Sequence, residues 1–289
     1  MKYAYIATLK EEHAILRMCH WLQVSRSGYY KSRHRTPSFQ SQRRAHVHKA
    51  VVLTFNKFKK RYGAPRITVE LNESGIQCSR NHIAELMAGA GLKARCGKNF
   101  RYSAATNKGN HVSENLLKRN FHANKPNEKW VSDITYIRLN RGFVYLAVIM
   151  DLFSRQIIGW ALDTTMTTDL ITQAFDMAVA SRKTQPGLIL HSDQGVQYRS
   201  GDYQARLLNA GIRPSMSRKG NCWDNAAMES FFARLKVESV YAESYQNKDE
   251  AYASVFEYIE LFYNNVRRHS ANEYKSPKQY EQEYYARCA

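Results

Sequence analysis

The sequence lacks a long hydrophobic segment. Its longest purely apolar run spans only residues 143–150, whereas a helix that crosses a bilayer needs about 20 apolar residues. Lys2 and Lys10 are not accompanied by the apolar stretch that a secretory signal peptide requires. We therefore expect a cytoplasmic protein that does not associate with membranes.

Cysteine is also scarce. The number of cysteines is odd and no two stand at metal-ligand spacing, which argues against a disulfide framework and a zinc site. The chain also has no solenoid-like repeat, low-complexity tract or sustained heptad pattern. Ordinary reduced thiols are expected at Cys19, Cys78, Cys96, Cys222 and Cys288.

Acidic residues are rare in the first part of the chain. Residues 1–124 hold 23 Lys/Arg and 6 Asp/Glu, a net charge of +17, while residues 125–289 hold 20 and 19, a net charge of +1. Such dense positive charge attracts polyanions. The alternatives are a merely solvated surface or an anionic membrane, but the basic residues do not line one long amphipathic helix. The asymmetry favours DNA or RNA as the partner.

Apolar spacing in this basic part indicates two pairs of short helices. In residues 12–35, apolar residues recur at helical steps from Ala14 to Leu22, and Ser25 is a plausible N-cap for a second helix.

In residues 66–94, a helix ends near Gly75 and Ser79 caps a second helix, which exposes Arg80 and Asn81 at its start. Two helices joined by a tight turn match a helix-turn-helix, although many helical hairpins bind nothing.

A polar stretch at residues 105–128 is typical of a linker, and patterns typical of strands and helices begin after it. We predict an α/β fold, in which a mixed sheet has helices on its faces and is preceded by helical helix-turn-helix segments. The expected strands and helices are residues 129–137, 143–150, 156–162, 168–182, 187–192, 203–209, 212–216 and 225–238. Five divisions are expected. Residues 1–60 form a basic helical segment with a short helix-turn-helix, and residues 61–105 form a helix-turn-helix-like DNA-binding domain. A linker at residues 106–125, a core at residues 126–240 and a helical C-terminal segment at residues 241–289 follow.

Three acidic residues stand where packing does not explain them. Asp133 lies within a predicted strand, where aspartate is uncommon. Asp193 directly follows a short apolar run, and so lies at the carboxyl end of a strand, where α/β sheets place ligand sites. Glu229 lies at the edge of the apolar stripe of its helix, on the same side as Asn225 and Lys236. Any one of them alone is best explained as an ordinary exposed acid.

Three converging carboxylates would suit a divalent metal. Mg²⁺ prefers hard oxygen ligands and retains several waters, so a few carboxylates suffice. Two such ions, about 4 Å apart, assist the cutting of a phosphodiester. Without metal the three charges repel one another, which makes the cluster a poor stabilising device. Turn and cap positions explain Asp151 and Asp224, with Asp151 the stronger candidate for a further role.

The same residues carry a resemblance to a known family. Thirty-five residues separate Asp193 from Glu229, and with Asp133 they resemble the D,D(35)E signature of the retroviral-integrase superfamily. The chain is similar to bacterial insertion-sequence transposases of the two-reading-frame kind, specifically their downstream-frame product. The similar stretches are residues 25–30, 61–66, 130–136, 191–198, 220–232, 263–269 and 276–277.

The resemblance implies a ribonuclease H-like fold with a five-stranded sheet, and a transposase that cleaves donor DNA ends and joins them to target DNA. It implies Asp133, Asp193 and Glu229 as the catalytic ligands of two Mg²⁺ or Mn²⁺ ions. It also implies a homo-oligomer on DNA, an upstream-frame partner protein and a place near the bacterial nucleoid. The expected DNA contacts are Arg66, Arg80, Asn81, His191, Asn225 and Lys236.

The chain also departs from its relatives. Retroviral integrases carry an N-terminal zinc domain, but His46 and His48 have no paired cysteines here, so we expect none. Two rival functions stay open: a structure-specific nuclease on the same fold, and a non-catalytic DNA-binding regulator. Joining of a 3′-OH end to target DNA separates a transposase from a nuclease, and metal-independent binding without nicking would favour the regulator.

Overall fold

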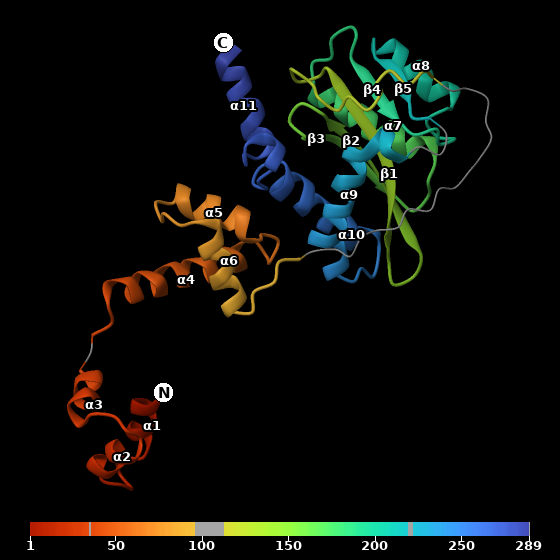
Figure 1. The fold of residues 1–289 in the computed structure, drawn as a ribbon. Coiled ribbons are helices and arrows are strands. Elements are labelled where there is room, and N and C mark those ends of the chain that lie inside the picture. Colours follow the sequence, from red (N-terminus) through yellow and green to blue (C-terminus); the bar gives the residue numbers. More distant parts are fainter. Residues whose placement is uncertain (35, 96–112, 219–221, 289) are drawn as a thin grey trace.

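A mixed five-stranded sheet organises residues 129–216 of the computed structural model, which describes residues 1–34, 36–95, 113–218 and 222–288. The strand order is β3-β2-β1-β4-β5, with β1, β2 and β3 antiparallel and β4 and β5 parallel to β1 (Figure 1). The predicted α/β fold is confirmed. The strands are β1 (Lys129–Arg138), β2 (Phe143–Asp151), β3 (Ile157–Asp163), β4 (Ile189–Ser192) and β5 (Arg213–Met216).

Three helices cover the faces of the sheet: α7 (Thr168–Ser181), α8 (Gly201–Asn209) and α9 (Ala226–Glu238). Side chains along a strand point alternately to opposite faces. In β2, Leu146 and Val148 belong to the core that contains α9, whereas Ala147 and Ile149 belong to the core that contains α7 and α8. This layering holds α9 against β1, so that the helix of Glu229 crosses the strand of Asp133.

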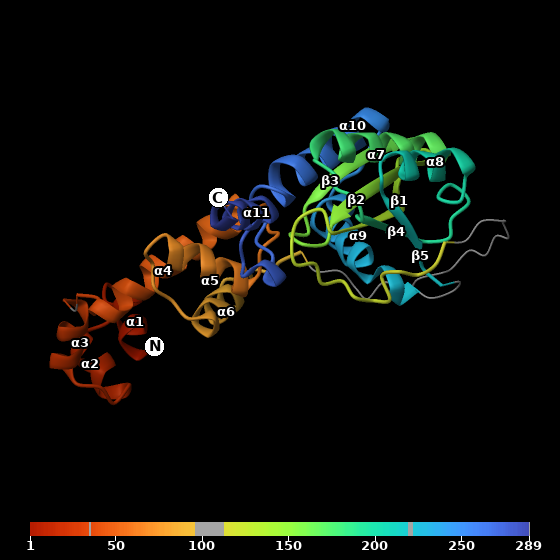
Figure 2. The same cartoon turned by 90° about the horizontal axis from the view of Figure 1, so that it is seen from above.

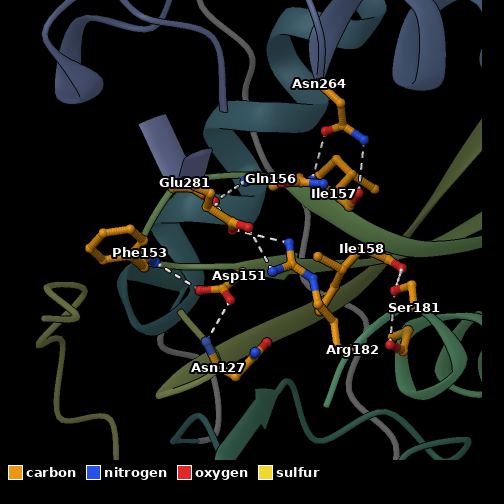
Figure 3. A network of polar contacts seen from close by, with 12 residues as sticks. Asn127, Asp151, Phe153, Gln156, Ile157, Ile158, Ser181, Arg182, Asn264 and Glu281 are labelled. Atoms are coloured by element: carbon orange, nitrogen blue, oxygen red, sulfur yellow. Dashed lines mark hydrogen bonds and ion pairs between the residues drawn. The ribbon is translucent and has the colours of Figure 1, made fainter. Parts of the chain in front are cut away.

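The chain after α9 packs back onto the edge of the sheet. Asn264 accepts the backbone N–H of Ile157 at 2.9 Å and donates to its carbonyl at 2.8 Å, which completes the edge of β3 (Figure 3). Glu281 accepts two hydrogen bonds from Arg182, at 2.7 and 3.0 Å. The predicted helical character is confirmed in η2 (Val240–Ala242), α10 (Lys248–Phe256), the π-helix η3 (Glu257–Tyr263), η4 (Ser270–Asn272) and α11 (Pro277–Cys288).

The described residues before the sheet contain six helices: α1 (Lys2–Thr8), α2 (Ile15–Trp21), α3 (Arg26–Arg33), α4 (Phe39–Lys57), α5 (Ala64–Glu73) and α6 (Arg80–Gly89). Both predicted helix pairs are present as α2–α3 and α5–α6. The predicted boundary at residue 60 falls between α4 and α5, although α4 packs against both α5 and α6. Helices α1–α3 have a small core of their own and lie at the end of the molecule opposite the sheet (Figures 1 and 2).

Helices α4–α6 share one hydrophobic core with the α9 face of the sheet. The buried Arg61 crosses this junction, because its Nε donates to the carbonyl of Glu238 at 3.1 Å and a terminal nitrogen pairs with Glu257 at 2.9 Å. Arg268 of the C-terminal segment also contacts α5, because it pairs with Glu70 at 2.6 Å. The helical N-terminal part is therefore tied to both the sheet and the C-terminal segment.

The predicted linker lies partly outside the described residues, in residues 105–112. From residue 113 onward it packs on the core, where Leu117 and Ala123 are buried. Within the described ranges, no helix is both long and apolar enough to cross a membrane.

Candidate active site

Asp133 lies on β1 where this strand loses one neighbour. β2 pairs with β1 along its whole length, but β4 pairs only with residues 129–131. Asp133 therefore stands at a partly open edge of the sheet, and its side chain is partly buried. Its Oδ1 accepts the N–H of Ile134 at 2.8 Å.

Asp193 directly follows β4, as the sequence predicts. In the parallel pairing of β1 with β4, Val131 faces His191, and each strand carries its aspartate two residues further on. Neighbouring strands lie about 4.8 Å apart, so Asp133 and Asp193 share one edge. The Oδ1 of Asp193 accepts the N–H of Gly195 at 2.8 Å, which holds the carboxylate at the start of the following loop.

Glu229 lies in the first turn of α9. The predicted apolar stripe, from Met228 to Leu235, is buried and fixes the helix on the sheet. At the N-cap, Asn225 donates its Nδ2 to the carbonyl of Ser132 at 3.2 Å. This bond brings the start of α9 beside the residue that precedes Asp133.

Asp133 is affected electrostatically by the other two carboxylates. Burial raises the pKa of Asp133 well above its usual range, and the negative charges of Asp193 and Glu229 raise it further, while Lys236 opposes them. Burial also raises the pKa of Asp193, which a backbone N–H and Arg199 partly offset. Burial raises the pKa of Glu229 as well. The fold therefore places Asp193 and Glu229 near enough to Asp133 for their charges to act on it.

The donor set suits a hard divalent cation by its chemistry. All three groups are carboxylates, and the buried Oδ1 of Asn225 has no hydrogen-bond partner. In the part of the chain that the structure describes, however, no three carboxylate, imidazole or thiol groups stand close enough together to hold an ion. Like charges without a counter-ion repel one another, and part of the rise in the pKa of Asp133 reflects this. The residues provide the ligand chemistry, but a tight cage is not preformed.

His191 and Lys236 flank the acids in different ways. The buried His191 places its Nδ1 2.8 Å from the Ser215 hydroxyl, and burial lowers its pKa to about 4. This contact joins β4 to β5 and closes the ring off from solvent. Lys236 is also buried, and its Nζ lies 4.7 Å from the centre of the Tyr136 ring. Its positive charge acts on Asp133, on the same side of α9 as Glu229.

Comparison with known proteins assigns residues 123–222 and 229–284 to two families described as "Integrase core domain" and residues 42–100 to one described as "HTH-like domain". "Transposase InsF for insertion sequence IS3A" of Escherichia coli (strain K12) is 43% identical over 283 residues, which cover 97% of this chain and 98% of that protein. "Transposase for insertion sequence element IS904" of Lactococcus lactis subsp. lactis (strain IL1403) is 42% identical over 249 residues, 86% of this chain and 98% of its own length. The chain belongs to the IS3 family of insertion-sequence transposases.

Similar solved structures are retroviral. The HTLV-2 integrase catalytic core domain in complex with magnesium is 18% identical, with a TM-score of 0.43 over 55% of this chain and 99% of that chain. A simian T-cell lymphotropic virus intasome in complex with PP2A regulatory subunit B56 gamma is 16% identical, with a TM-score of 0.47 over 74% and 70%. The ribonuclease H-like assignment of this transposase rests on its sheet topology and on the integrase core match.

The transposase has an HTH-like domain, and the predicted DNA contacts in it occupy different environments. Arg80 and Asn81 are exposed at the start of α6, as expected. Arg66 is only partly exposed, because its Nε donates to the carbonyl of Arg268 at 2.8 Å and its guanidinium lies 5.5 Å from the centre of the Tyr62 ring. Arg66 therefore joins α5 to the C-terminal segment, and its contact with DNA stays a prediction.

Asp224 is not the helix cap that its position suggested. Asn225 is the N-cap of α9, and no side-chain cap bond forms there. Instead the fully buried Asp224 carboxylate pairs with Arg119 at 2.9 Å and with Arg218 at 3.4 Å, and accepts a bond from Asn115 at 2.9 Å. Two of these partners are more than 100 residues away, so no local pattern could have indicated them.

Sequence reasoning also missed the ion pair at the other end of α9. Glu238 and Arg267 are both buried and form two hydrogen bonds at 2.6 and 2.7 Å. The only available signal was that Arg267 lies in residues 263–269, one of the stretches that carried the family resemblance.

Proposed function

We propose that this transposase cuts and joins DNA at Asp133, Asp193 and Glu229, which would hold two Mg²⁺ or Mn²⁺ ions. The observation that supports the proposal is geometric: Asp133 and Asp193 each lie two residues beyond the paired positions Val131 and His191, and Asn225 ties the start of the helix of Glu229 to Ser132. Bound metal would activate the attacking oxygen and neutralise the leaving one.

The neighbouring residues would prepare the site and hold the DNA. Asn225 fixes the start of α9 through the carbonyl of Ser132, and so sets where Glu229 points. Lys236 keeps a positive charge beside Asp133, suited to a phosphate of the DNA end. The neutral ring of His191 supports β4 from within. Arg80 and Asn81 would contact DNA from the N-terminus of α6.

The DNA partners would be the ends of the insertion element and the target duplex. Because the two ends must be cut and joined together, we infer a homo-oligomer on DNA, working with an upstream-frame protein in the bacterial cytoplasm near the nucleoid. Cross-linking of the protein on a paired-end DNA substrate, with and without that upstream product, tests both inferences.

The central test uses purified protein, Mg²⁺, a labelled element end and target DNA. Asp133→Asn, Asp193→Asn and Glu229→Gln should each lower strand joining by at least about 100-fold, since loss of even an outer-shell partner of a metal ligand costs about 10- to 100-fold. DNA binding, measured by gel shift, should survive in all three. Asp176→Asn is the matched control, because this acid is exposed on α7. Normal joining in any of the three site variants would refute the assignment.

The same assay separates the rival functions. A nuclease on this fold would release cut DNA in Mg²⁺ without any joined product. A regulator would bind the element end without metal and nick no substrate. The joined product is therefore the decisive species, and its absence alongside cleavage would favour the nuclease.

A further inference from the structure

The helices at the start of the chain form a separate small unit. Ile6, Met18, Cys19 and Tyr29 are between 0% and 5% exposed and make a core that joins α1, α2 and α3. This core is distinct from the one that α4–α6 share with the sheet. The unit therefore has its own fold, in front of the HTH-like domain.

The turn between α2 and α3 begins like the turn between α5 and α6, although four residues form the first and six form the second. In the first, Gln23 adopts a left-handed φ of 52° and the N–H of Val24 donates to the carbonyl of Cys19 at 2.9 Å. In the second, Gly75 adopts a φ of 86° and the N–H of Ile76 donates to the carbonyl of Leu71 at 2.8 Å. Both are Schellman-type helix ends.

Helices α3 and α6, the second helices of the two pairs, also begin alike. Each starts with a Ser-Arg pair, and the serine hydroxyl accepts the N–H three residues on, at 3.0 Å for Ser25 and 3.3 Å for Ser79. The fourth residue after each serine, Tyr29 or Ile83, is buried against the preceding helix. Only four residues separate α2 from α3, the tight spacing of a DNA-binding helix-turn-helix.

The outer face of α3 is basic. Arg26, Ser27, Tyr30, Lys31 and Arg33 are all exposed, and the helix contains no acidic residue. The guanidinium of Arg26 lies 5.7 Å from the centre of the Tyr30 ring. Among the described residues, no carboxylate forms an ion pair with these three cations. This face is complementary to a polyanion.

We propose that α2 and α3 form a second DNA-reading head, in which α3 enters a major groove with Arg26, Ser27 and Tyr30 at its contact face. The proposal rests on the proposed binding of element ends. Helix α4 separates the two heads (Figures 1 and 2). Its 19 residues span about 28 Å, and from Arg43 onward it also contacts the second head. The two heads would therefore read sites within about one helical turn, the roughly 34–36 Å that separates successive major grooves on one face of DNA.

A hydroxyl-radical footprint of the full chain on a labelled element end, without divalent metal, tests the proposal. The wild-type protein should protect two patches about one turn apart. Arg26→Ala should lose one patch and bind about tenfold more weakly, since a base contact is removed. Arg80→Ala should lose the other patch. Lys10→Ala is the matched control, because it removes one exposed charge from the same unit and should keep both patches.

A single protected patch in the wild type, or two intact patches in Arg26→Ala, would overturn the proposal. Exposed apolar residues on α2, Leu16 at 63% and Trp21 at 73%, define the competing use of this unit as a protein-docking face. If Leu16→Ser with Trp21→Ser lowers the sedimenting mass and Arg26→Ala leaves both patches intact, the docking face replaces the DNA head. The footprint needs neither metal nor the three acids, so Asp133→Asn should retain it even if joining fails.

Discussion

At the scale of single residues, Asp151 has a structural role. Its carboxylate is fully buried and accepts the N–H groups of Asn127 at 2.7 Å and Phe153 at 2.9 Å, which holds the turn after β2 (Figure 3). The predicted turn position is confirmed. Burial and the negative charge of Glu281 raise its pKa to about 6, although the two backbone bonds lower it.

The raised pKa of Asp151 predicts a pH dependence of stability. The folded protein holds this proton up to about pH 6, while the unfolded chain releases it near pH 4, so the contribution is full below pH 4 and is lost as pH rises through 6. The loss amounts to about 3 kcal/mol. Urea unfolding between pH 4 and 7 should show this fall for the wild type and not for Asp151→Asn. Asp176→Asn should follow the wild type, and parallel curves for all three proteins would contradict the prediction.

At the scale of elements, the approach of α7 to β3 depends on a glycine. A Cβ at Gly159 would lie 2.1 Å from the carbonyl oxygen of Ala174 and 2.9 Å from the Cβ of Ala178. Backbone cannot yield as a flexible side chain does. The small residues on both sides therefore let helix and strand pack at a distance that larger side chains would prevent.

Gly159→Ala should therefore destabilise the fold by about 1–3 kcal/mol, the usual cost of overpacking. Gly201→Ala is the matched control, because a Cβ there meets nothing within 4 Å and the residue begins α8. It should be neutral or stabilise by up to about 1 kcal/mol. Chemical denaturation measures both, and equal unfolding midpoints would show that α7 can shift at little cost.

At the scale of the whole molecule, Glu238 joins three parts of the chain at the end of α9. Its carboxylate binds Arg267 of the C-terminal segment, and the hydroxyl of Tyr258 donates to it at 3.0 Å. Its backbone carbonyl accepts from Arg61 and Arg95 of the N-terminal part, at 3.1 and 2.6 Å. The helix that carries Glu229 is thus held from both ends of the sequence.

Breaking this pair should destabilise the whole molecule. Glu238→Ala and Arg267→Ala each leave a buried charge without its partner, which costs about 3–5 kcal/mol. The pair between Asp176 and Arg206 is exposed, at 57% and 52%, so Asp176→Ala should cost less than about 1 kcal/mol. Thermal and urea unfolding of the three variants test this. If Glu238→Ala and Arg267→Ala lost no more stability than Asp176→Ala, the buried pair would contribute little to the junction.

Several features were predictable because they depend on short stretches of sequence. Strand-like runs bounded by turn residues predicted the strands, and helical spacing with a serine cap predicted α3 and α6. The spacing of Asp193 and Glu229 carried the family resemblance. Helix α1 was not expected, and neither was the packing of α4 with α5 and α6.

The sequence by itself therefore indicated most of the order of elements, the sheet class and the three candidate acids, because period and spacing are local properties. Only the tertiary structure decided which charges meet. It placed Asp224 between Arg119 and Arg218, buried His191 against Ser215, and turned Arg66 toward Arg268. The physical reason is that these partners lie 6 to 202 residues apart, and their meeting depends on how sheet, helices and C-terminal segment pack together.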